Sequence, residues 1–136
     1  MNELDRGRER HLVSTVNGIV ATTRANGTIQ MSPNWYLWTG ESVLISTLSW
    51  TAKVRNIRRD PRASVCIDDP ESGRYVVISG HANVIADDPV RDLTLSLLRK
   101  YVPEPEVVPH WERINRNHDR VIIEVKAEHL LWRKGY

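Results

Sequence analysis

Alternation of apolar and polar residues predicts that the chain is built mainly from β-strands. Asn26-Gly27 is a strong hairpin signal between the first two strands, and Thr39-Gly40-Glu41 is a turn into the third. We therefore expect the first three strands to form an antiparallel meander, with Pro33 marking an edge or a bulge in the second. The six predicted strands span residues 19–23, 28–38, 42–48, 62–68, 75–85 and 120–126.

Apolar residues spaced three and four positions apart predict a few helices between these strands. They lie at 4–15, at 51–59, and from Asp87-Asp88-Pro89 to about Tyr101. Pro103, Pro105 and Pro109 predict a stiff loop, followed by a short helical piece at 111–115. Six strands with few helices and mostly short connections indicate an antiparallel β-barrel.

A length of 136 residues is typical of a single domain with its own core. We divide the expected domain, 1–136, into four segments. They are an N-terminal helix (1–16), the main barrel strands with the helix that carries the candidate site (17–86), a helical insertion with the Pro-rich loop (87–116), and a final strand with a C-terminal tail (118–136).

Composition and charge narrow the class of protein. There is no apolar run of about 18 residues that would span a membrane, and residues 1–10 are too charged for a signal peptide. One cysteine excludes an internal disulfide and fits a reducing compartment, so we expect a cytoplasmic protein. The net charge of +2 favours a small phosphorylated ligand over nucleic acid.

The richest chemistry lies where the third strand leads into the second helix. Ser49, Thr51 and Lys53 would surround the free amides of the first helical turn, an arrangement that suits an anion. On a helical wheel, Lys53 and Asn56 border the buried stripe of Val54 and Ile57. Arg55 and Arg59 face away, and Arg58 is a possible distal contact. The alternatives are a solvated helix whose cations only confer solubility, or a nucleic-acid-binding face of Arg55, Arg58 and Arg59.

These residues resemble a known family. The matching segments are Val20-Ala21-Thr22, Gly27, Pro33-Asn34-Trp35-Tyr36, and the run from Thr51-Ala52-Lys53 to Asp60-Pro61. They resemble the pyridoxamine 5'-phosphate oxidase-like FMN-binding split β-barrel superfamily, most closely its branch that uses the deazaflavin coenzyme F420. The resemblance runs over residues 19–84 and resumes weakly at 119–125.

The resemblance implies a six-stranded split barrel and a homodimer with two cofactor sites in the grooves between subunits. The cofactor ring would lie against the third strand at Ser46, Thr47 and Leu48, and the phosphate beside Thr51, Ala52 and Lys53. Trp35 and Trp50 bracket this region and would pack on a ring, in the core or at the dimer contact. Arg74 and Tyr75 are in a part of the chain that relatives use for cofactor contacts.

Two departures from the family pattern bear on the cofactor. Residues 42–48 contain no cation, which disfavours FMN and favours F420. Thr51 stands where some F420-using relatives have an arginine, so a contact to the oligoglutamate tail is absent or comes from another residue.

The function expected from this resemblance is an oxidoreductase that transfers a hydride from reduced F420 to an organic acceptor. No side chain is assigned as a catalytic acid, and the five scattered histidines have no metal-ligand spacing. The alternatives are an FMN-dependent flavoprotein resembling pyridoxamine phosphate oxidase, and a carrier that binds the deazaflavin without turnover.

Overall fold

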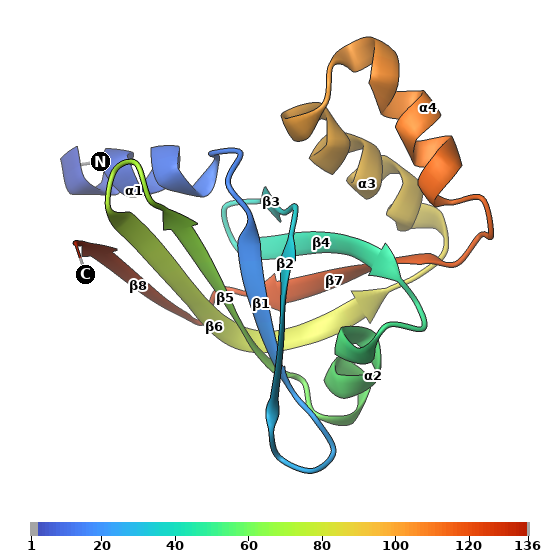
Figure 1. Cartoon of the computed structure of the whole chain (residues 1–136), viewed down its shortest axis with the longest axis horizontal. Coiled ribbons are helices and arrows are strands. Elements are labelled where there is room, and N and C mark those ends of the chain that lie inside the picture. The colour runs from blue at the N-terminus through green and yellow to red at the C-terminus, as the bar shows by residue number, and fades with distance from the viewer. Residues whose placement is uncertain (1–2, 136) are drawn as a thin grey trace.

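The computed structural model describes residues 3–135, so residues 1–2 and 136 of the expected domain lie outside the described part. Within it the chain forms a mainly β fold of eight strands and four helices, consistent with a split barrel (Figure 1). The helices are α1 (Glu3–Leu12), α2 (Ala52–Arg59), α3 (Asp88–Tyr101) and α4 (Glu104–Ile114). The strands are β1 (Gly18–Thr23), β2 (Ile29–Asn34), β3 (Leu37–Trp38), β4 (Ser42–Leu48), β5 (Arg62–Asp69), β6 (Arg74–Ile85), β7 (Arg120–Lys126) and β8 (His129–Lys134).

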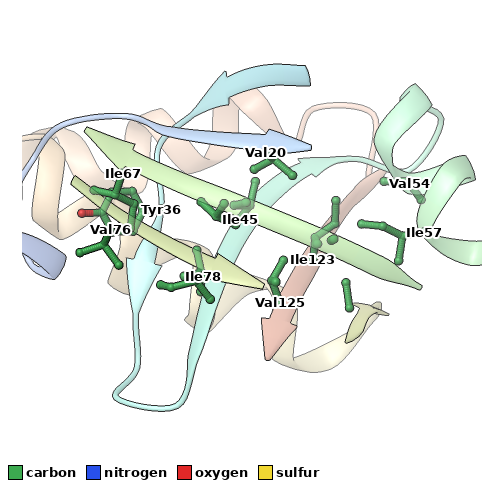
Figure 2. Close-up of a cluster of buried hydrophobic side chains, with 14 of the residues drawn as sticks. Val20, Tyr36, Ile45, Val54, Ile57, Ile67, Val76, Ile78, Ile123 and Val125 are labelled. Atoms are coloured by element: carbon green, nitrogen blue, oxygen red, sulfur yellow. The ribbon is translucent and has the colours of Figure 1, made fainter. Parts of the chain in front are cut away.

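The strands form one antiparallel sheet in the order β2-β1-β5-β6-β7-β4-β3, and β8 pairs with β6. The alternation that predicted the strands places one set of side chains inside. In β5, for example, Ala63, Val65 and Ile67 are buried. Figure 2 shows this core, with Val54 and Ile57 of α2 at one end of the cluster.

Strands β4 and β7 are buried on both faces. Val43 and Ile45 of β4 face the main core, whereas Leu44 packs with α3 and α4 in a second cluster around Trp111. Figure 1 shows α3 and α4 side by side above β4 and β7. This double cover explains why Val43, Leu44 and Ile45 are apolar at consecutive positions instead of alternating with polar residues.

Gly80 is the point where the long strand β6 is crossed by another part of the chain. The first half of β6 pairs with β5 and β8, and its second half pairs with β7 from Ala82 onward. A Cβ atom at residue 80 would lie 1.9 Å from the carbonyl oxygen of Lys126, the last residue of β7. Only glycine permits so close an approach of two backbones.

Three expectations about the fold were wrong, and a fourth, the meander, holds only in part. The segment 28–38 is interrupted at Trp35 and Tyr36, because Tyr36 turns inward and its N–H donates to the Tyr101 hydroxyl at 3.2 Å. The antiparallel neighbours expected of the first three predicted strands are present, since β1 pairs with β2 and β3 pairs with β4, but the break between β2 and β3 interrupts the meander and the other edge of β4 pairs with β7. Strand β8, which alternates only between exposed and half-buried residues, was not predicted and brings the number of strands to eight rather than six. The expected Pro-rich loop belongs to helix α4, with Pro105 in its first turn, where a missing N–H costs nothing.

One negative observation concerns membranes. Among the helices of the described residues, none combines the length and the apolar character that a bilayer crossing requires.

Candidate functional site

Helix α2 begins with backbone amides that no side chain caps. The N–H of Ser49 donates to the Asp119 carbonyl at 2.8 Å, and that of Thr51 donates to the Leu48 carbonyl at 3.1 Å, so β4 turns sharply into the helix. Thr51 occupies the N-cap position, but its hydroxyl donates to Leu48 O at 3.0 Å instead of accepting from the helix. The first turn therefore remains available to an external anion.

Lys53 is a buried cation beside these amides. Its exposed fraction is only 9%, and it makes no hydrogen bond or ion pair with the described residues. Burial lowers the pKa of Lys53, and the neighbouring Arg120 guanidinium lowers it further. A buried, unpaired positive charge is costly, and an anion bound next to it would remove that cost.

Arg120 is the site residue that sequence reasoning missed. It is the first residue of β7 and lies opposite Leu48 in the register with β4. Its Nε donates to the Ile114 carbonyl at 3.3 Å, and burial lowers the pKa of this guanidinium. Strand β4 has no cation of its own, but β7 supplies one at the same place. Only the pairing of strands far apart in sequence reveals it.

A small cavity of about 180 Å³ adjoins this positive region and is lined by Arg120, Ser46 and Trp35. Leu97, Leu98 and Ile114 give it apolar walls. The hydroxyls of Ser46 and Thr94 are 3.0 Å apart and are hydrogen-bonded to each other. The site thus combines a cationic end with an apolar, aromatic end, a combination that suits a phosphorylated ring compound.

The Trp35 ring is held in place by α3. It stacks on Tyr101 with ring centroids 4.6 Å apart and an angle of 2° between the planes. Lys100 lies 3.4 Å from the centroid of the Tyr36 ring and donates to the Tyr36 carbonyl at 3.0 Å, and burial lowers the pKa of Lys100 to about 8. The stack on Tyr101 orients the Trp35 indole, although this side chain is 38% exposed.

The predicted faces of α2 are confirmed, because Lys53, Val54, Asn56 and Ile57 are buried and Arg55, Arg58 and Arg59 are exposed. The Asn56 amide, however, is directed at β1. Its Nδ2 donates to the Thr22 hydroxyl at 3.1 Å, so it has a structural partner.

The structure brings most of the predicted residues to one place. Ala52 and Thr51 form the start of α2, and the Thr51 hydroxyl lies 3.5 Å from that of Thr47 near the end of β4. Arg58, on the outer side of α2, lines a different and larger cavity.

Arg74 and Tyr75 are not near Lys53 within one chain. They begin β6 opposite Asp69 and Asp68, at the end of β5 remote from α2. The Arg74 guanidinium lies over the Trp132 ring, 5.7 Å from its centroid. A role for either residue at the site therefore requires a second subunit and stays a prediction.

Comparison with solved structures gives close matches over nearly the whole chain. An F420 reductase is 28% identical, with 90% of this chain and 94% of that chain covered and a TM-score of 0.74. A conserved hypothetical protein from Mycobacterium tuberculosis is 23% identical, with 98% and 85% covered and a TM-score of 0.79. The heme storage protein HutZ from Vibrio cholerae shares the fold at 13% identity, with 98% of each chain covered and a TM-score of 0.77.

The family comparison agrees with the fold. Residues 12–132 match the pyridoxamine 5'-phosphate oxidase family model, a range that includes every strand from β1 to β7 and the whole candidate site around Lys53. This chain belongs to the pyridoxamine 5'-phosphate oxidase family.

Proposed function

We propose that this protein binds coenzyme F420 and transfers a hydride from the reduced cofactor to an organic acceptor. The observation that carries the proposal is Lys53, a buried cation without a partner among the described residues, beside the uncapped first turn of α2. The 28% identity with an F420 reductase supports this choice of cofactor.

The chain's own residues fit a phosphorylated ring cofactor. Lys53, the first amides of α2 and Arg120 would hold the phosphate, and the β4 segment from Ser46 to Leu48 would lie along the ring. When bound, the reduced deazaflavin supplies the hydride. Trp35 and the apolar walls of the 180 Å³ cavity would orient the acceptor and exclude water.

FMN is the alternative cofactor. The lack of a cation in β4 disfavoured FMN, but Arg120 of β7 supplies a charge opposite Leu48. Charge at this position therefore does not distinguish the two cofactors, and the preference for F420 rests on its reductase relative.

Titration of the purified protein with F420 and with FMN tests the proposal. We expect tighter binding of F420, followed by acceptor-dependent oxidation of reduced F420 across a panel of small aromatic and conjugated acceptors. Tight F420 binding without turnover would identify a carrier, and tighter FMN binding a flavoprotein. Failure to bind either cofactor would contradict the proposed function.

We further propose that the protein acts as a homodimer, with the sites between subunits. Ile29 and Met31 are 54% and 62% exposed and lie on one face of β2, the edge strand that pairs only with β1. An apolar stripe on a sheet edge is suited to contact with a second copy. In such a dimer, Arg74 and Tyr75 of one subunit would contribute to the cofactor site of the other.

We expect light scattering to give the mass of a dimer for the wild type and of a monomer for Met31→Glu. In a symmetric interface the substitution buries two carboxylates, one from each subunit. Val13→Glu is the matched control, since Val13 is similarly exposed but lies just after α1. A wild-type monomer, or equal masses for Met31→Glu and wild type, would contradict the proposed interface.

A further inference from the structure

The cavity of about 180 Å³ next to Trp35 also contains an imidazole. His110, in the middle of helix α4, contributes to the lining and is half-buried. The centroid of its ring lies 5.8 Å from that of the Trp35 ring, with an angle of 32° between the planes. The imidazole therefore lies at the aromatic end of the cavity, where the acceptor is expected to bind.

Arg113 fixes which nitrogen of His110 carries the proton. Its Nη2 lies 3.0 Å from His110 Nδ1, one turn earlier on the same helix. A guanidinium group can only donate a hydrogen bond, so Nδ1 accepts one and has no proton of its own. In a neutral imidazole the N–H is then at Nε2. This nitrogen has no hydrogen-bond partner among residues 3–135.

The surroundings of His110 keep its imidazole neutral. Burial lowers the pKa of His110, and the positive charges of Arg113 and Arg120 lower it further, against an opposing effect of Glu106. Because the ordinary pKa of histidine is about 6.5, a lowered value leaves the ring uncharged at neutral pH. His110 therefore offers the cavity a neutral N–H donor rather than a positive charge.

The rest of the lining also favours a ligand oxygen. None of the described residues that line this cavity is acidic. Ser46 and Thr94 share one hydrogen bond of 3.0 Å, which uses the hydrogen of only one of their two hydroxyl groups. Leu97 and Leu98 provide the apolar wall. Donors on an apolar wall suit a ring compound that carries an oxygen atom.

We propose that His110 donates its Nε2–H to an oxygen atom of the organic acceptor, and that Arg113 is the positioning residue that keeps this proton on Nε2. The role in turnover rests on the proposed function. As the acceptor gains the hydride at a carbon atom, the electron pair of its double bond moves onto the oxygen. A solvent proton then completes the reduced product. A donor that is fixed before the reaction stabilises the charge on oxygen, and a neutral imidazole does so without losing its own proton.

The first arm of the test uses no cofactor. Its probes are acetophenone and α-methylstyrene, which has a CH2 group in place of the oxygen. We expect acetophenone to shift the amide NMR signals of residues 94–98 and 110–114, which include much of the lining. It should bind about fivefold or more tightly than α-methylstyrene, because the alkene leaves the donor unpaired.

Three variants assign this preference to the imidazole. His110→Phe should lose most of it, whereas His110→Gln, which keeps an N–H at a similar distance from the backbone, should retain it. His129→Phe is the matched control, because His129 begins β8 and does not line the cavity.

The role of Arg113 is read from the imidazole itself. Nitrogen NMR of the wild type should show the Nε2–H tautomer of His110. Arg113→Ala should give a mixture of tautomers and weaken the binding of acetophenone. An Nδ1–H tautomer in the wild type would overturn the inference.

The second arm measures turnover with reduced F420 and a carbonyl acceptor. His110→Phe should lower kcat about tenfold or more without changing the affinity for F420, and His110→Gln should restore most of the rate. Acetophenone binding that depends on His110 supports the inference even if the protein fails to bind F420. Absence of acetophenone binding, an undiminished preference in His110→Phe, or a wild-type rate in that variant would overturn the inference even if F420 binds.

Discussion

Replacing Lys53 by alanine is expected to weaken F420 binding by about tenfold or more. Losing a hydrogen bond to a charged group costs about 1.5–3 kcal/mol, which corresponds to roughly a 10- to 150-fold change in Kd. Because Lys53 has no partner among the described residues, its removal leaves no orphaned protein group behind. The effect should therefore appear in cofactor affinity, measured by fluorescence titration, rather than in stability.

Two controls separate binding from folding. Lys53→Met keeps the volume but removes the charge, and its Tm should equal or exceed that of the wild type because the charge is buried at a cost. Arg55→Ala removes the same charge from the exposed face of α2 and should leave affinity nearly unchanged. Unaltered affinity in a folded Lys53→Ala protein would refute the assignment of the phosphate site.

The same lysine predicts how binding depends on pH. Burial and the neighbouring Arg120 lower the pKa of Lys53. The free protein therefore loses this proton at a lower pH than an exposed lysine does, whose pKa is about 10.4. The protonated form binds the anion, so affinity should fall as the pH rises through this lowered pKa. The decline should be absent from Lys53→Met.

Gly80→Ala is expected to cause the largest loss of stability of any conservative substitution proposed for this chain. The added Cβ would lie 1.9 Å from Lys126 O and 3.0 Å from Lys126 C, both backbone atoms. Relief requires moving either β6 or the end of β7, and both are fixed by strand pairing. We expect a loss of at least about 3 kcal/mol in the free energy of unfolding, or a decrease in Tm of roughly 10 °C.

Gly7→Ala provides the matched control for this experiment. Gly7 lies inside α1, and a Cβ there would make ordinary contacts of 3.5 Å with Arg74 and 3.7 Å with Trp132. Because alanine favours the helical conformation more than glycine does, the free energy of unfolding of this variant should rise by about 0.5–1 kcal/mol. Urea unfolding of both variants checks the pair, and a loss below about 1 kcal/mol for Gly80→Ala would show that the crossing can relax.

What the sequence could predict was local. The buried face of α2 follows from a 3.6-residue period within eight residues, so a helical wheel is enough to place Lys53 beside the core. The amphipathic strand β5 was predictable for the same reason, since its alternation depends only on neighbours in the chain.

What the sequence could not predict depends on pairing between distant segments. Turn signals correctly placed β4 beside the segment before it, where the short β3 pairs with it, but they could not show that the whole of β4 pairs with β7, more than seventy residues further along the chain. Arg120 was missed because its position opposite Leu48 exists only in that register. Trp35 was predicted as a candidate site residue, but its stacking on Tyr101 was not, because Tyr101 lies in α3 and nothing in the sequence indicates that this helix packs against Trp35.

The pairing of Leu48 with Arg120 has a consequence for synthesis of the protein. A ribosome that has made α2 has produced Lys53 and its amides but not the second cation, nor the strand that fixes β4 from that side. Strand β6 likewise completes its pairing only after β7 and β8, which follow it in the chain, have been made. The nascent chain thus cannot assemble its anion site until β7 has been made, so cofactor binding requires that the strands from β4 to β7 have folded together.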